Sequence, residues 1–256
     1  MNYLRIVELV KTASEFVFDE KLKKSINMKG ESDFVTAVDL QISTFIKEEL
    51  KVLTPDIGFM SEEDAVDLSP KRWILDPIDG TTNLVYDYNM SSVSLAYYDG
   101  EKVDFGVIYN PFNKDLFIAK YGEGATLNGR KLQNAPDREL KDCLIEFGAG
   151  STKKQYTEQS FSIAKNVFKS CLDIRRICSS ALAIAYVAAG KLNGYFERSI
   201  KPWDYAAATL ILNECGGKCS DWQGEPIQYE HSTSFVCGTP KVYDFLMETI
   251  NKHADN

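Results

Sequence analysis

Two aspartates three residues apart form the strongest chemical signal in this sequence. Asp76 and Asp79 lie in the run DPIDGTT, directly after the apolar residues 73–75. Carboxylates held this close repel each other unless a cation lies between them, and ligand sets made only of oxygen favour Mg²⁺ or Mn²⁺ over zinc. The glycine and threonines that follow resemble the start of a helix, where free backbone N–H groups bind phosphate. Metal and phosphate in one turn predict metal-assisted phosphoryl chemistry.

The residues between and after the two aspartates favour an irregular turn. Pro77 fixes its own φ and has no N–H, so a continuing strand is not expected there. The carbonyl of Ile78 could then be a further oxygen ligand, and Gly80 allows the backbone to approach a ligand closely. The simpler alternative is a helix N-terminus with two capping aspartates. The length of the motif favours the metal site.

Three other acids are candidates for the same site. Glu62 and Glu63 follow the apolar pair Phe59-Met60, and Asp204 lies in the run KPWDYAAA. Taken alone, Asp204 would cap the N-terminus of a helix, because a proline and then an acid mark a helix start. Glu62 and Glu63 alone would be solvated surface charges.

Composition bounds the class of protein. The chain has 256 residues and a net charge of −8, which disfavours nonspecific nucleic-acid binding. Apolar runs stay well short of the ~18 residues that a membrane span needs, and the N-terminus has a helical pattern rather than that of a signal peptide. We therefore expect a cytoplasmic protein. The six cysteines are expected to be buried free thiols, because the CxxxC spacing of Cys215 and Cys219 lacks a second pair for zinc. His231 and His253 are expected at the surface, which leaves little material for histidine catalysis.

Hydrophobic spacing and turn signals predict a mixed α/β (α+β) fold in layers. Residues 91–132 have the short β-rich runs and turns of an antiparallel meander. We treat residues 1–256 as one domain, with a subdivision near residue 150 left open. The remaining expected elements are helices over 3–24, 39–53, 155–169, 179–190, 203–215 and 241–252, and strands over 73–75, 143–147, 171–177, 194–197, 218–222 and 234–238.

Three segments in this order resemble the inositol monophosphatase family: GFMSEED, WILDPIDGTTNLV and KPWDYAAATLILNECGG. The resemblance covers nearly the whole chain and includes VTAVD at 35–39 and GYFE at 194–197. It implies a layered αβαβα sandwich, usually assembled as a homodimer. It also implies Mg²⁺-dependent hydrolysis of a phosphate monoester, often inhibited by lithium.

The resemblance implies a metal site with two or three Mg²⁺ ions, for which Mn²⁺ could substitute. The implied ligands are Glu62, Asp76, Asp79, Asp204 and the Ile78 carbonyl. Four carboxylates need about two divalent cations for charge balance. One ion would lower the pKa of a bound water and so make a nucleophile, and another would stabilise the leaving alkoxide.

Other residues gain catalytic and phosphate-binding roles from the same resemblance. Thr81 would orient the attacking water, and Asp39 would hold Thr81 in place. Backbone N–H groups of Gly80 and Thr81 would bind phosphate oxygens, with Thr82 beside them in the substrate site. Lys29 matches a family lysine near the outer metal and the phosphate, although its spacing to the next aspartate is one residue shorter than in that family.

The residues implied in substrate choice depart from the family pattern. Glu197 matches an acid that bonds substrate hydroxyls, and its alternative is a surface charge at a strand end. Ser179 and Ser180 match a helix start that contacts the polyol, and Asp204 borders the same site. Cys178 stands in place of a glycine and Ala183 in place of an acid. Arg198-Ser199 stands in place of an apolar residue and a glycine.

These departures bear on inositol specificity rather than on phosphatase chemistry. Arg175, Arg176 and Arg198 could bind a second anionic group, or they could be ordinary surface arginines.

The expected substrate is a small phosphorylated metabolite, with inositol monophosphate first. Relatives that act on fructose 1,6-bisphosphate, NADP, histidinol phosphate or 3′-phosphoadenosine phosphate are alternatives. Thr82-Asn83, where some of those relatives carry lysine, favours the inositol type. A non-enzymatic alternative also stays open, because some bacterial members of this family bind transcription machinery and act as regulatory scaffolds. No membrane contact and no direct nucleic-acid contact are expected.

Overall fold

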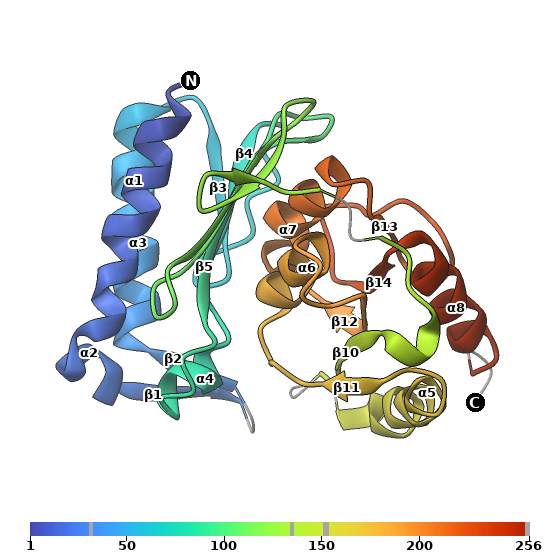
Figure 1. Ribbon diagram of the computed structural model, residues 1–256. Coiled ribbons are helices and arrows are strands. Elements are labelled where there is room, and N and C mark those ends of the chain that lie inside the picture. The colour runs from blue at the N-terminus through green and yellow to red at the C-terminus, as the bar shows by residue number, and fades with distance from the viewer. Residues whose placement is uncertain (31–32, 134–135, 151–153, 254–256) are drawn as a thin grey trace.

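Two β-sheets alternate with three layers of helices (Figure 1). The computed structural model describes residues 1–30, 33–133, 136–150 and 154–253. From the N-terminal side the order is helices, sheet, helices, sheet, helices, which confirms the predicted αβαβα sandwich. Whether the chain is one domain stays a prediction.

The first sheet has seven strands in the order β3-β4-β5-β6-β7-β8-β9. β3 and β4 are parallel, and every later neighbour is antiparallel, which confirms the predicted meander. The strands are β3 (Gly58–Ser61), β4 (Arg72–Asp79), β5 (Ser92–Tyr98), β6 (Val103–Asn110), β7 (Asp115–Lys120), β8 (Gly124–Leu127) and β9 (Arg130–Lys131).

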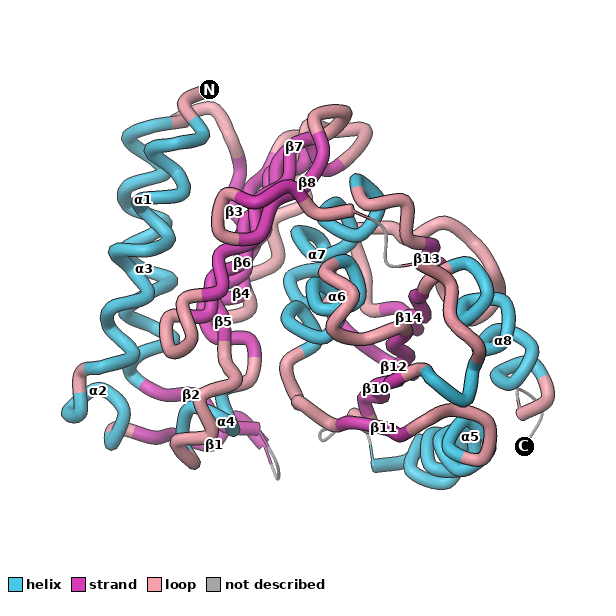
Figure 2. The backbone as a smooth tube through the Cα atoms, in the orientation of Figure 1, coloured by secondary structure: helices cyan, strands magenta, loops and turns pink. Residues whose placement is uncertain are grey.

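The second sheet has five strands in the order β11-β10-β12-β14-β13. β10 is parallel to both of its neighbours, whereas β14 is antiparallel to both of its own. Figure 2 draws the strands in magenta and the helices in cyan, so that the layers can be followed. The strands are β10 (Leu144–Gly148), β11 (Asp173–Arg175), β12 (Gly194–Ile200), β13 (Lys218–Ser220) and β14 (Thr233–Gly238).

The central helix layer lies between the sheets and is buried almost all round, as an interior helix must be. It consists of α6 (Ser180–Ala188) and α7 (Pro202–Glu214), and its alanines allow close packing. The outer layers are α1 (Tyr3–Ser14) and α3 (Ala37–Leu53) on the seven-stranded sheet, and α5 (Thr157–Phe168) and α8 (Pro240–Asn251) on the five-stranded sheet. Short helical segments are η1 (Glu15–Phe18), α2 (Glu20–Lys24), α4 (Thr81–Val85), η2 (Leu140–Asp142) and η3 (Lys154–Tyr156).

Several boundary predictions were wrong for local reasons. The single helix expected over 3–24 is broken, because Asp19 caps a new helix by accepting hydrogen bonds from the N–H groups of Lys21 and Leu22. A hairpin of β1 (Ile26–Gly30) and β2 (Asp33–Thr36) was not predicted. β4 continues through Pro77 as far as Asp79, where we expected a turn.

The cysteine and histidine predictions hold in part. All six cysteines are free, but burial was predicted correctly for only three of them: Cys143, Cys215 and Cys237 are buried, Cys171 and Cys219 are partly exposed, and Cys178 is exposed. His231 is exposed, whereas His253 is partly buried and its Nε2 lies 2.6 Å from Asn166 Nδ2. Each helix in the described part of the chain is too short or too polar to cross a membrane. The cytoplasmic location stays a prediction.

Candidate metal and phosphate site

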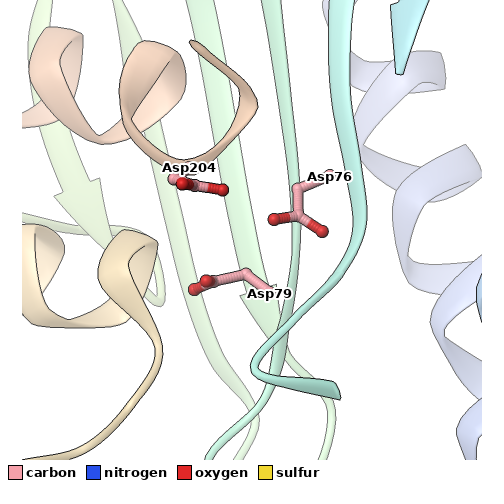
Figure 3. Close-up of side chains that lie close together, drawn as sticks. All are labelled: Asp76, Asp79 and Asp204. Atoms are coloured by element: carbon pink, nitrogen blue, oxygen red, sulfur yellow. The ribbon is translucent and has the colours of Figure 1, made fainter. Parts of the chain in front are cut away.

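Three aspartates from two elements meet at the edge of the seven-stranded sheet. Asp76 and Asp79 come from the end of β4, and Asp204 comes from the first turn of α7 (Figure 3). One carboxylate oxygen from each lies within 4.8 Å of the others. This spacing suits oxygen ligands around one or more hard cations.

A β-bulge brings the two aspartates of β4 to one side of the strand. Asp76 pairs with Ser94 of β5 and Asp79 pairs with Ser92, so two residues of β4 stand opposite one residue of β5. Residues three apart in a regular strand point to opposite faces, and the extra residue cancels that difference. Pro77 fits such a position because it has no N–H to offer the ladder. The Ile78 N–H donates to Asp76 Oδ1 at 3.0 Å and holds that carboxylate.

Asp204 is both a helix cap and a member of the acidic cluster. Its Oδ2 accepts a hydrogen bond from the Lys201 N–H at 2.7 Å, at the start of α7. Ser94 Oγ donates to the Trp203 carbonyl oxygen at 3.3 Å, which ties this helix start to β5. The capping interpretation was therefore right about the local structure, but it does not account for the neighbouring aspartates.

The electrostatics of the cluster favour a bound cation. Burial and then the charges of Glu62 and Asp79 raise the pKa of Asp76 well above its ordinary value. Burial and the charge of Asp79 do the same to the pKa of Asp204. Burial raises the pKa of Asp79 to about 6, although hydrogen bonds from Ser179 and α6 oppose this. A divalent cation would offset both the cost of burying these carboxylates and the repulsion between them.

The other predicted ligands border the same cavity. This cavity has a volume of about 260 Å³ and is lined by Glu62 and Ile78 as well as by the three aspartates. Glu62 follows β3, and its N–H donates to the Leu75 carbonyl oxygen at 3.3 Å. Glu63 is not among the residues that line the cavity.

Thr81 and Asp39 are in contact, as the family resemblance implied. Thr81 Oγ1 lies 3.1 Å from Asp39 Oδ1 and 3.0 Å from the Ile78 carbonyl oxygen. The other oxygen of Asp39 accepts from the Thr36 N–H at 2.8 Å and from Thr36 Oγ1 at 2.6 Å. Burial raises the pKa of Asp39 to about 6. Asp39 thus joins the start of α3 to the start of α4.

Gly80 requires a conformation that other residues adopt at a cost. It precedes α4 with φ +89°, and a Cβ atom there would lie 3.1 Å from the Met90 carbonyl oxygen and 3.2 Å from that of Cys178. Gly80, Thr81 and Thr82 all line the cavity. The described backbone thus places the first residues of α4 beside the three aspartates. The side chain of Lys29 lies outside the described residues.

The start of α6 holds a carboxylate of the acidic cluster. Ser179 Oγ donates to Asp79 Oδ2, and the N–H groups of Ser180 and Ala181 lie 3.1 and 2.9 Å from Asp79 oxygens. Ser179 is buried and its proton is committed to Asp79. The structure thus places Ser179 behind Asp79 as well as on the cavity wall.

Glu197 lies buried in the opposite wall of the cavity, so the surface-charge alternative was wrong. It accepts hydrogen bonds from Tyr195 Oη, from Ser180 Oγ at 3.2 Å and from the Gly150 N–H at 3.1 Å. A Cβ atom on Gly148 would lie 2.1 Å from the carboxyl carbon of Glu197. Gly148 thus makes room for this carboxylate. Burial raises the pKa of Glu197.

Sequence reasoning missed Tyr195 and Glu146, which both line the cavity. Glu146 is 2% exposed, and its Oε1 accepts from the Ile177 N–H at 2.7 Å. Burial raises the pKa of Glu146 to about 8. The available signal was an acid within the apolar run of residues 144–147, because an unpaired acid is rarely found in a buried strand.

The three arginines have different surroundings. Arg176 lines the cavity, with its guanidinium 5.4 Å from the Phe147 ring centre. Arg198 follows Glu197 on β12 and so points to the other face of the sheet, where it lies 4.9 Å from the Tyr156 ring and 5.4 Å from the Trp222 ring. Arg175 pairs with Asp173. Of the three arginines, Arg176 is the one placed to meet a substrate.

The two residues that depart from the family pattern next to Ser179 have distinct environments. Cys178 adopts φ +60° and lines the cavity. Ala183 is fully buried in α6. The change at Cys178 therefore borders the cavity, whereas the change at Ala183 lies in the packed centre of the molecule.

Comparison with known proteins shows that this layered fold belongs to one family. The sequence profile of the inositol monophosphatase family matches residues 3–255. The chain belongs to the inositol monophosphatase family. The "Nus factor SuhB" of Escherichia coli (strain K12) is 36% identical over 225 residues, which cover 86% of this chain and 84% of that protein.

Further relatives carry phosphatase names. An "Inositol-1-monophosphatase" of Mesorhizobium japonicum is 33% identical over 238 residues, covering 92% of this chain and 89% of that protein. The structure of the Thermotoga maritima IMPase superposes with a TM-score of 0.90 at 28% identity, covering 100% of this chain and 99% of that one. An "IMPase/NADP phosphatase complexed with Mg2+ and phosphate" gives a TM-score of 0.85 at 25% identity, covering 98% and 97%.

Proposed function

We propose that this protein hydrolyses a phosphate monoester of a small polyol or sugar with the help of Mg²⁺, and that inositol monophosphate is the substrate to test first. One observation carries the proposal: the carboxylates of Asp76, Asp79 and Asp204 converge within 4.8 Å beside the start of α4. The name of the Mesorhizobium relative supports the polyol, and a solved relative complexed with Mg²⁺ and phosphate supports the metal.

The acidic residues are proposed to hold the metal. Asp76, Asp79, Asp204, Glu62 and the Ile78 carbonyl would supply oxygen ligands for two or three ions, with Mn²⁺ as a substitute. When bound there, such ions supply an acidified water and charge neutralisation at the leaving oxygen.

The remaining residues are proposed to orient the reactants. Thr81 Oγ1 lies near two acceptors, Asp39 Oδ1 and the Ile78 carbonyl oxygen; with its proton on Asp39, its oxygen lone pairs would accept a hydrogen bond from the attacking water. Backbone N–H groups of Gly80 and Thr81, with Thr82 beside them, would bind phosphate oxygens as charge builds up in the transition state. Glu197 would accept hydrogen bonds from substrate hydroxyls, held in place by Tyr195.

Phosphate release from inositol monophosphate, with Mg²⁺ and with EDTA, tests this function. We expect turnover with Mg²⁺ and its loss on metal removal, and turnover that survives EDTA would contradict the mechanism. Parallel assays on fructose 1,6-bisphosphate, NADP, histidinol phosphate and 3′-phosphoadenosine phosphate would rank the alternatives, and assays with added LiCl would measure lithium inhibition. A cytoplasmic homodimer is part of the proposal, and sedimentation analysis of the purified protein tests the dimer.

A second function is favoured by the names of the relatives. Several are called "Nus factor SuhB", which supports a regulatory role through a protein partner in the transcription machinery. Pull-down with purified RNA polymerase, alongside turnover assays, tests this role. Recovery of polymerase with negligible turnover on every phosphate would rank the scaffold above the enzyme.

A further inference from the structure

Ile177 and Cys178, which precede the N-cap residue Ser179 of α6, form a turn that we call the 177–178 turn. Side chains from two distant segments hold its backbone. Asn83 Nδ2, from α4, lies 2.7 Å from the Ile177 carbonyl oxygen and 3.4 Å from that of Cys178. Glu146 Oε1, from β10, accepts from the Ile177 N–H at 2.7 Å. Both polar backbone groups of Ile177 are therefore held by side chains.

The two holding side chains are buried, and Asn83 has a second anchoring contact. Asn83 is 7% exposed and Glu146 is 2% exposed. Asn83 Nδ2 also lies 2.7 Å from the Met90 carbonyl oxygen, so its amide bridges the loop before β5 and the 177–178 turn. Buried polar groups with such partners fix local geometry, because losing one partner leaves the other unsatisfied.

The held turn determines where α6 begins. Cys178 adopts φ +60°, which is unfavourable for a residue with a Cβ atom and persists only where the surroundings impose it. Directly after it, Ser179 Oγ and the N–H groups of Ser180 and Ala181 bond the carboxylate of Asp79. A displaced turn would carry these donors away from Asp79.

We propose that Asn83 and Glu146 are positioning residues, which hold the 177–178 turn so that the start of α6 fixes the Asp79 carboxylate in the orientation needed to bind metal. The inference rests on the metal site of the proposed function, and it can be tested by metal binding without any measurement of hydrolysis. Residues that orient metal ligands typically change metal affinity about 10–100-fold when they are removed.

Mn²⁺ alone is the probe, and its binding to the full chain is followed by the electron paramagnetic resonance signal of free Mn²⁺. We expect Asn83→Ala and Glu146→Ala to weaken Mn²⁺ affinity about 10–100-fold. Glu146→Gln keeps a carbonyl oxygen for the Ile177 N–H, so its Mn²⁺ affinity is expected to stay within about threefold of wild type.

Asn193→Ala is the matched control. Asn193 is also a buried asparagine, 5% exposed, and its Oδ1 accepts from the Leu144 N–H at 2.9 Å, at the other end of β10 from Gly148. This variant is expected to lose stability and keep wild-type Mn²⁺ affinity. If Asn83→Ala does not fold, Asn83→Ser and Glu146→Ala carry the test.

Wild-type Mn²⁺ affinity in folded Asn83 and Glu146 variants would overturn the inference, as would an equal loss in Asn193→Ala. Neither result would affect the proposed function, which is judged by phosphate release from the wild-type protein. Conversely, a wild-type protein that binds Mn²⁺ but hydrolyses no phosphate ester would contradict the proposed function and leave the comparison of Mn²⁺ affinities intact.

Discussion

The two walls of the cavity are built in different ways. The wall with the three aspartates, which we call the acidic wall, draws Asp76, Asp79 and Thr81 from one continuous segment of β4 and α4 and adds Asp204. The opposite wall, which we call the glutamate wall, combines Glu146, Ser180, Tyr195 and Glu197 from β10, α6 and β12. The first is a local motif, and the second exists only once distant segments have packed together.

On the proposed function, we expect the acidic wall to serve the hydrolysis and the glutamate wall to set the choice of substrate. A bulge and a helix start set the directions of Asp76 and Asp79 by backbone geometry, and donors from the start of α6 then hold the Asp79 carboxylate. On the glutamate wall, each acid depends on donors from elsewhere, such as Tyr195 and Ile177. A substitution at Tyr195 changes the surface offered to the substrate without removing a contact of the three aspartates, whereas a substitution at Glu146 also acts on Asp79 through the 177–178 turn.

The largest expected effect is on the acidic wall. Asp76→Asn keeps the oxygen that accepts from the Ile78 N–H but removes a charge from the cluster. We expect Mg²⁺-dependent hydrolysis to fall more than about 100-fold, because a ligand is lost. We also expect the metal-free protein to melt at a higher temperature, because repulsion among buried acids is relieved. Phosphate release and thermal unfolding in EDTA measure the two effects.

Asp115→Asn is the matched control for that variant. Asp115 is buried too, but it is paired with Lys191 Nζ at 2.7 Å and lies outside the cavity wall. Its loss should lower the melting temperature and leave hydrolysis unchanged. Equal loss of hydrolysis in the two variants would mean that the acidic cluster has no special role.

The pH dependence of stability should also differ between the walls. Folding raises the pKa of Asp79 to about 6 and that of Glu146 to about 8. The folded protein thus holds protons that the unfolded chain has released, so the free energy of unfolding falls as pH rises. For Asp79 this fall spans about pH 4 to 6 and amounts to about 3 kcal/mol at most, and for Glu146 it continues to about pH 8.

Magnesium should separate the two contributions. Mg²⁺ replaces the protons on the three aspartates of the cluster, so saturating Mg²⁺ is expected to reduce the fall between about pH 4 and 6, to which Asp39 and Glu146 still contribute. The fall that remains up to about pH 8 should disappear in Glu146→Gln. Urea unfolding from pH 4 to 8, with EDTA or with Mg²⁺, measures both. If the free energy of unfolding of the metal-free protein does not change with pH, burial does not raise the pKa values of these acids.

Local signals made the acidic wall predictable. The apolar strand, Asp76, Asp79 and Gly80 are adjacent in sequence, so their chemistry could be inferred without knowing the fold. The bulge was not predicted, because its register depends on the pairing of β4 with β5. Glu146 was missed for a related reason: its role depends on Ile177 and Tyr195, which lie beside it only in the folded protein.

Element boundaries followed the same rule. The layered fold could be predicted because helical periodicity and the meander are repeated over many residues. The helix over 3–24 was predicted too long, because hydrophobic spacing continued past Asp19 while the cap restarted the helix there. The side of β12 on which Arg198 lies follows from alternation once the direction of Glu197 is known.

A smaller effect is expected from the glutamate wall. Glu197→Gln should lower kcat/KM for inositol monophosphate about 10-fold, because a charged acceptor for hydroxyls becomes a neutral amide. The same variant should keep p-nitrophenyl phosphate hydrolysis within about twofold, because that ester offers no hydroxyls to the wall. Tyr195→Phe removes a donor to Glu197. It should lower kcat/KM for inositol monophosphate less than Glu197→Gln does, and it should also leave p-nitrophenyl phosphate hydrolysis nearly unchanged. Equal losses on the two esters would place Glu197 in the chemistry rather than in specificity.

The smallest effect concerns the left-handed residue that each wall contains. The acidic wall has Gly80 at φ +89° and the glutamate wall has Cys178 at φ +60°. A side chain in this region costs about 1 kcal/mol or more, and glycine returns part of that gain through its unfolded-state entropy. Cys178→Gly is therefore expected to stabilise the protein by about 0.5 kcal/mol, measured by urea unfolding. Cys178→Ala keeps the Cβ atom and should give no gain, so the difference between the two variants isolates backbone strain from the loss of the thiol.

Gly80→Ala should destabilise the protein, because its Cβ atom would also press on the Met90 and Cys178 carbonyls. If Cys178→Gly and Cys178→Ala have the same stability, the turn before α6 is not strained, and the two walls differ less than their backbone angles indicate.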